Sequence, residues 1–205
     1  MELQFVRNMI VLWLCIFLLS PGQIISNSLV GCDPYDVILP VACGASSLDS
    51  IPFTGIPDHV VFTHTLEKSC YGLIECCDIV RSLQSYHVDV LDWSNIGFNF
   101  LIGNDGRVYV GRGWNQVGQF STHYNEKSLS VAFIGNYYEK PPERKALSTV
   151  KSLLKCAVFK KRLAMNYTLH MHEDLECSSN PAPGLKQEIT TWLHYEGKAA
   201  DYLRC

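Results

Sequence analysis

The sequence lacks the concentrated positive charge on which binding to nucleic acid depends. It holds 17 Lys and Arg against 20 Asp and Glu, a formal net charge of -3, and lysine and arginine form no stripe along it. A small basic cluster, Lys160-Lys161-Arg162, lies at the end of a predicted helix, where cations complement the helix dipole. The charge pattern therefore argues against a nucleic-acid partner.

Also missing is an apolar run long enough to span a bilayer, which takes about 20 residues. The run Met9–Leu19 is shorter, follows Arg7 and precedes Ser20-Pro21-Gly22. These features are typical of a secretory signal peptide, with cleavage between about residues 20 and 28. We expect residues 1–26 to be this signal peptide and the mature chain to be secreted, extracellular and without a membrane span. The alternative is a buried N-terminal helix.

Repeats and low-complexity tracts are absent as well, and 205 residues with 47% hydrophobic and 18% charged residues suit one globular domain. Apolar periodicity predicts five strands interleaved with three helices. This order predicts a single α/β domain, with a mixed central β-sheet of about five strands flanked by about three helices. The predicted strands are His59–Thr65, Phe98–Ile102, Arg107–Val110, Leu129–Gly135 and Tyr167–Met171, and the predicted helices are Cys76–Tyr86, Ala146–Val158 and Leu185–Tyr195. The domain is expected over 58–196, between an extended segment, 27–57, and a tail, 197–205.

A hairpin with a glycine-rich continuation lies within Asp92–Gly118. Asn104-Asp105-Gly106 separates two of the predicted strands and tolerates the positive φ of a tight turn. Gly111-Arg112-Gly113-Trp114 then leaves the sheet as a loop.

This segment resembles the peptidoglycan recognition proteins, which are relatives of the zinc N-acetylmuramoyl-L-alanine amidases. The resemblance covers roughly Asp58 to Tyr195 and is also carried by Cys70, Cys76, the Pro183-Gly184 turn and Trp192. It implies the amidase-like fold and innate-immune recognition of bacterial peptidoglycan, with other recognition or signalling proteins as further partners.

Nine cysteines, or eight without Cys15 in the predicted signal peptide, suit an oxidising compartment. The resemblance implies two disulfides, Cys70 with Cys76 and Cys32 with Cys156. It leaves Cys43, Cys77, Cys177 and Cys205 without assigned partners. Asn166-Tyr167-Thr168 is a glycosylation sequon, or a chance triplet.

The resemblance also implies that this chain lacks two of the three zinc ligands of the amidases. The amidases take three ligands from a His-His-Thr strand, a Gly-His-Arg strand and a Thr-x-Cys-Pro-Gly turn, and keep a fourth position open for water. Here His172 matches a ligand, but Thr63 and Ala182 stand at the other two positions, and the family's active-site tyrosine is Phe98. We therefore expect no metal, no other cofactor and no amidase activity.

The implied groove would hold a muramyl peptide against aromatic walls and a few polar groups. Arg112 could fork onto the carboxylate that distinguishes meso-diaminopimelate from lysine stem peptides, so we expect a weak preference for the diaminopimelate type. Each candidate also has a plainer interpretation, such as a core aromatic or a turn former. By motif the groove residues are His64, Trp93, Phe98, Arg112, Trp114, Tyr124 and Asn125.

Two alternatives stay open. Phe98 and Phe120 make the groove more apolar than the family pattern, which favours an accessory or decoy protein that no longer binds peptidoglycan. An active amidase would need a rearranged zinc site, with His170 and Cys177 beside His172. Cysteine in a secreted chain is more often in a disulfide, which argues against that set.

Overall fold

The described residues form one mixed six-stranded sheet. The computed structural model describes residues 36–48, 50–178 and 181–203, so the predicted signal peptide, Cys32 and Cys205 lie outside them. The strand order is β1-β4-β3-β5-β2-β6, in which only β3 and β4 pair antiparallel. The strands are β1 Val37–Ile38, β2 His59–His64, β3 Phe100–Ile102, β4 Val108–Val110, β5 Ser128–Phe133 and β6 Thr168–Met171. The predicted mixed α/β sheet is confirmed, with β1 as a strand that the sequence did not predict.

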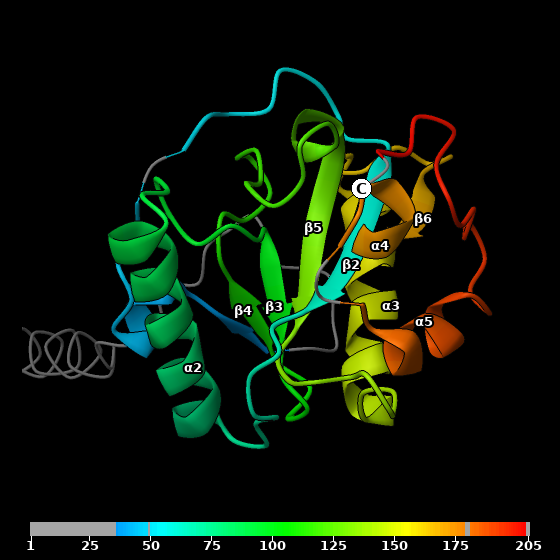
Figure 1. The fold of residues 1–205 in the computed structure, drawn as a ribbon. Coiled ribbons are helices and arrows are strands. Elements are labelled where there is room, and N and C mark those ends of the chain that lie inside the picture. The colour runs from blue at the N-terminus through cyan, green and yellow to red at the C-terminus, as the bar shows by residue number, and fades with distance from the viewer. Residues whose placement is uncertain (1–35, 49, 179–180, 204–205) are drawn as a thin grey trace, which may run out of the picture. The chain divides into compact units, whose positions relative to one another are not determined.

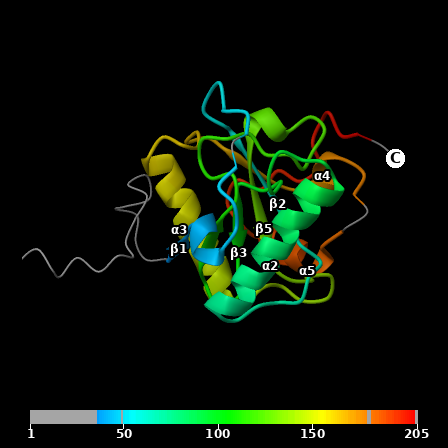
Figure 2. The ribbon, with the colours of Figure 1, turned by 90° about the vertical axis from the view of Figure 1, so that its left-hand side faces the viewer.

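Helices cover both faces of this sheet. Figure 1 looks onto the face that carries α2 and α4, and Figure 2 shows α2 and α3 on opposite sides of the strands. The helices are η1 Pro40–Cys43, α2 Leu73–Ser85, the π-helical η2 Tyr86–Val90, η3 Asn125–Lys127, α3 Arg144–Phe159, α4 His172–Leu175 and α5 Pro183–Ile189. No helix of the described residues is long and apolar enough to cross a membrane.

The last predicted helix, Leu185–Tyr195, is wrong in its extent, because α5 ends at Ile189. The hydroxyls of Thr190 and Thr191 donate to the carbonyls three residues earlier, at 3.1 and 2.7 Å, which competes with continued helix. His194 then adopts a φ of 76°, in the left-handed region that a right-handed helix excludes.

Strand alternation fixes which side chains reach each face. Ala132 of β5 packs with the buried side of α2, and its neighbour across the ladder is Thr63. Phe62 and Phe133 therefore lie on the α3 face, where their rings are 6.1 Å apart. The same alternation places Thr63 and His64 on opposite faces of the sheet.

Disulfides fasten α2 at its beginning. Cys70–Cys76 forms as predicted, and Cys43–Cys77 is a pair that the sequence could not assign. Cys156 and Cys177 are also disulfide-bonded. The predicted partner of Cys156, Cys32, lies outside the described residues. The sequon residue Asn166 is exposed, and glycosylation there stays a prediction.

Candidate functional site

A polar pocket of about 440 Å³ opens in the loop between β4 and β5. Figure 1 shows this loop, in green, between α2 and β5. Two residues predicted by motif, Arg112 and Asn125, meet there. The lining residues are Ile51, Ser94, Arg112, Val117, Gly118, Gln119, Thr122, His123, Asn125 and Glu126.

The Arg112 guanidinium organises the wall of the pocket. It is 6% exposed, and it donates from Nε to the Ile96 carbonyl at 2.8 Å and from a terminal nitrogen to Gln119 Oε1 at 2.9 Å. Burial lowers the pKa of Arg112, but arginine stays protonated in proteins. Among the described residues no carboxylate lies within ion-pair distance of it, so this buried cation is held by neutral oxygens.

Two asparagines shape the loop that carries Arg112. Asn125 Oδ1 accepts the backbone N–H groups of Phe120 and Ser121, both at 3.0 Å. Asn99, which the sequence did not single out, is fully buried. Its Nδ2 donates to the Gly113 carbonyl at 2.8 Å and its Oδ1 accepts from the Ser130 backbone at 2.9 Å. The loop is therefore anchored to β5 through one side chain.

An aromatic cluster borders this wall. The His87 ring lies 4.6 Å from Trp93 and 5.7 Å from Phe98, between centroids. Asp92 adopts a φ of 55°, a conformation that favours glycine. Trp93 and Phe98 are partly exposed.

The pH dependence of stability should report this cluster. Burial, followed by the charge of Arg112, lowers the His87 pKa to about 4, and its Nδ1 accepts from the Gly97 N–H at 3.0 Å. Because the folded state resists protonation of His87, protons bind His87 more readily in the unfolded state. The contribution of neutral His87 to the free energy of unfolding is therefore complete above the unfolded pKa of 6.5 and is lost as pH falls toward 4. Between pH 6.5 and 5.5 the free energy of unfolding should fall by about 1 kcal/mol.

Urea unfolding at both pH values measures this loss, with His87→Gln as the variant that cannot titrate. An equal pH dependence in wild type and His87→Gln would contradict it.

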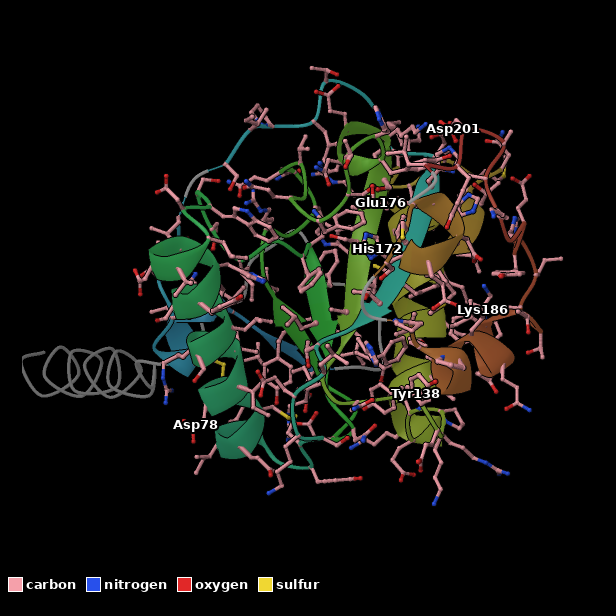
Figure 3. All side chains as sticks on the ribbon, in the orientation of Figure 1. Asp78, Tyr138, His172, Glu176, Lys186 and Asp201 are labelled. Atoms are coloured by element: carbon pink, nitrogen blue, oxygen red, sulfur yellow. A yellow bond between two sulfur atoms is a disulfide. The ribbon has the colours of Figure 1, made fainter. Side chains whose placement is uncertain are left out.

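A histidine–glutamate pair lies on the same face of the sheet. His172 Nε2 and Glu176 Oε1 are 2.7 Å apart, and Figure 3 shows both over the strands. Glu176 Oε2 also accepts the Thr122 N–H at 3.0 Å, which connects the pair to the polar pocket. Burial raises the Glu176 pKa, but its bonds to Thr122 and His172 outweigh burial and lower it. The Phe120 ring lies beside His172, with 6.0 Å between the two ring centroids.

The residues present do not fit a catalytic zinc. Thr63 and Ala182 offer no nitrogen or sulfur ligand, and the one matching histidine, His172, is bonded to Glu176. In the rearranged set, His170 Nδ1 lies 2.8 Å from the Gly197 carbonyl, and Cys177 is disulfide-bonded. Among the described residues no three His, Cys, Asp or Glu side chains are placed to hold a metal ion.

Of the seven residues predicted for the groove, only Arg112 and Asn125 line the polar pocket. Trp93 and Phe98 belong to the aromatic cluster, and the other three are buried elsewhere, which corrects their assignment. His64 is 3% exposed on the α3 face and accepts the Tyr137 N–H at Nδ1. Trp114 is buried against Phe100, 4.3 Å between centroids. Tyr124 is 5% exposed and donates its hydroxyl to Asp201 at 2.6 Å. Burial in the core or under the C-terminal segment removes these side chains from the pocket wall.

Known proteins are similar to this chain in sequence and in fold. Residues 54–184 match the N-acetylmuramoyl-L-alanine amidase family, Amidase_2. The chain is 42% identical over 137 residues to peptidoglycan recognition protein 3 of Mus musculus, covering 67% of this chain and 40% of that protein. It is 40% identical over 136 residues to a peptidoglycan recognition protein of Trichoplusia ni, covering 66% and 75%. The structure of human PGRP-IβC in complex with glycosamyl muramyl pentapeptide superimposes with a TM-score of 0.75 at 32% identity, over 78% of this chain and 98% of that one. The chain thus spans less than half of the mouse relative.

Proposed function

The chain belongs to the peptidoglycan recognition proteins, and on that premise we propose that it is a secreted receptor that binds bacterial peptidoglycan without cleaving it. The observation that carries the proposal is the polar pocket, in which Arg112, Gln119 and Asn125 present polar groups near the partly exposed aromatic residues Trp93 and Phe98. A muramyl peptide offers amides and carboxylates to the polar groups and apolar sugar faces to the rings.

A preference for diaminopimelate-type stem peptides is part of the proposal. Arg112 lines the pocket and has no acidic partner among the described residues, so a ligand carboxylate would supply the missing counter-charge. Arg112→Thr should reduce the preference for diaminopimelate-type over lysine-type fragments by about 1 to 3 kcal/mol, because the charge-assisted pair is desolvated. Competition titration with the two soluble fragments measures this ratio.

Arg112→Lys is the matched variant, because it keeps the charge and loses the planar fork; its preference should fall between those of wild type and Arg112→Thr. Since Arg112 also bonds loop carbonyls, circular dichroism must first show that each variant is folded. An unchanged preference in folded Arg112→Thr would remove diaminopimelate selectivity from the proposal.

The absence of catalysis follows from the chemistry of the donor set. With Thr63 and Ala182 at two ligand positions and Phe98 in place of the tyrosine, the purified protein should retain far less than one zinc ion per chain after mild dialysis. It should also release no stem peptide from peptidoglycan. An active zinc amidase carried through the same dialysis is the control, and stoichiometric zinc together with released stem peptide would contradict non-catalysis.

A second candidate is an accessory or decoy protein on the same fold. It is favoured by Phe120, which packs with Val61, Tyr124 and Leu175 and faces His172. This ring puts apolar surface where the family pattern has polar contacts. Failure to bind any peptidoglycan, with the fold intact, would select this candidate.

A further inference from the structure

An apolar groove of about 710 Å³ lies between the second half of α3, the start of β6 and the residues that follow α5. It shares no residue with the polar pocket. Three large side chains at its edge are mostly in solvent: Phe159 is 76% exposed, Met165 81% and Leu193 83%. A contiguous exposed apolar patch of this kind often marks a binding site, whereas single exposed apolar residues do not.

The groove has an apolar floor and an aromatic wall. Leu154, Val158 and Leu169 line it, and His194 stacks on Tyr167 at 4.3 Å to form one wall. The floor continues to the largely buried ring of Trp192.

The charges along the groove are of one sign. Lys151 and Lys155 line it, and no Asp or Glu is among the described lining residues. Lys151 lies over the Trp192 ring, 4.4 Å from the centroid, and 3.6 Å from Glu188. Lys155 forms no ion pair within the described part of the chain, which leaves its charge available to a ligand.

We propose that this groove binds a single-chain anionic amphiphile of the fatty carboxylate class, with the alkyl chain on Leu154, Val158 and Leu169 and the carboxylate at Lys155. The volume lies within the range of about 300 to 1,000 Å³ that small-molecule sites occupy. Apolar lining with a few placed polar groups is the composition of such sites. Lys155, which forms no ion pair within the described part of the chain, selects the sign of the headgroup.

A second copy of the chain is a weaker fit. A two-fold symmetric contact places the same patch on both sides, so Lys151 and Lys155 would approach the lysines of the other copy. Like charges brought together in this way disfavour association.

Calorimetric titration of the mature, disulfide-bonded protein with dodecanoate, below its critical micelle concentration, tests the proposal. We expect one site per chain. Dodecyltrimethylammonium, which has the same chain length and the opposite charge, should bind at least about tenfold more weakly, and acetate should give no heat of binding. Equal binding of the two amphiphiles, or no binding of dodecanoate, would overturn the proposal.

Variants locate the site. Leu193→Asp places a carboxylate at the groove edge and should weaken dodecanoate binding at least about tenfold, as should Lys155→Glu. The matched control is Ile74→Asp on α2, because Ile74 is 79% exposed and does not line the groove; its affinity should equal that of wild type.

Sedimentation velocity of wild type and Leu193→Asp completes the test. If wild type is a dimer that Leu193→Asp dissociates, and dodecanoate does not bind, a second copy occupies the groove and the proposal is wrong. Because the polar pocket is separate, failure here leaves peptidoglycan binding untouched.

Discussion

Replacing both Cys43 and Cys77 with alanine should lower the free energy of unfolding by about 4 kcal/mol, whereas replacing Cys70 and Cys76 should lower it by about 2 kcal/mol. The two bridges close loops of different length, with sequence separations of 34 and 6 residues. A longer closed loop removes more conformational freedom from the unfolded chain, so its loss costs more. Urea unfolding of the two double variants, with the remaining disulfides oxidised, measures both values.

Each double variant serves as the control for the other. All four cysteines are at most 5% exposed, so substitution removes similarly buried side chains in both variants and the difference in stability reports loop length. Cys43–Cys77 also connects η1 to α2, so its loss should release the segment before β2. Equal losses of stability, or a larger loss for the Cys70–Cys76 variant, would contradict the assignment of Cys43–Cys77 as the stronger restraint.

Asn99→Ala should lower the free energy of unfolding by about 3 kcal/mol. Its side chain is fully buried and bonds the carbonyls of Gly113 and Gln116 and the backbone and hydroxyl of Ser130. Truncation leaves these buried groups without partners, and each unsatisfied group costs more than the bond contributed. The same variant should weaken peptidoglycan binding, because the loop that carries Arg112 loses its anchor on β5.

The matched control is Asn166→Ala in protein made without glycosylation. Asn166 is exposed, and substitutions at such positions change stability by about 0.5 kcal/mol or less. Chemical denaturation of both variants gives the comparison. A loss below about 1 kcal/mol for Asn99→Ala would show that the loop is held in another way.

Much of the sheet could be predicted because burial of parallel strands requires continuous apolar runs. Those runs identify β2 and β5, and the Asn104-Asp105-Gly106 turn between β3 and β4 has Gly106 at a φ of 76°. Strand β1 could not be predicted, since two residues carry no periodicity and pairing with β4 alone defines them. The Cys43–Cys77 disulfide could not be predicted either, because the spacing of cysteines along the chain does not reveal their distance in space.

Some residues of the candidate site could likewise be predicted from the sequence, and others could not. Arg112 and Asn125, which were predicted by motif, both line the polar pocket. Loop aromatics such as Trp114 and Tyr124 can turn toward the core or the surface without a change in the motif. Glu176 was missed although it stands four residues after His172, a spacing at which helical side chains meet. His87 gave no signal, since its partners depend on how the segment after α2 folds back.

The most direct test of peptidoglycan recognition is co-sedimentation of the mature, disulfide-bonded protein with insoluble diaminopimelate-type peptidoglycan, with lysine-type peptidoglycan and cellulose as controls. We predict that the protein pellets with diaminopimelate-type material, pellets less with lysine-type material and stays in solution with cellulose. A folded protein that pellets with neither peptidoglycan would contradict the receptor function and make partner proteins the ligands to identify.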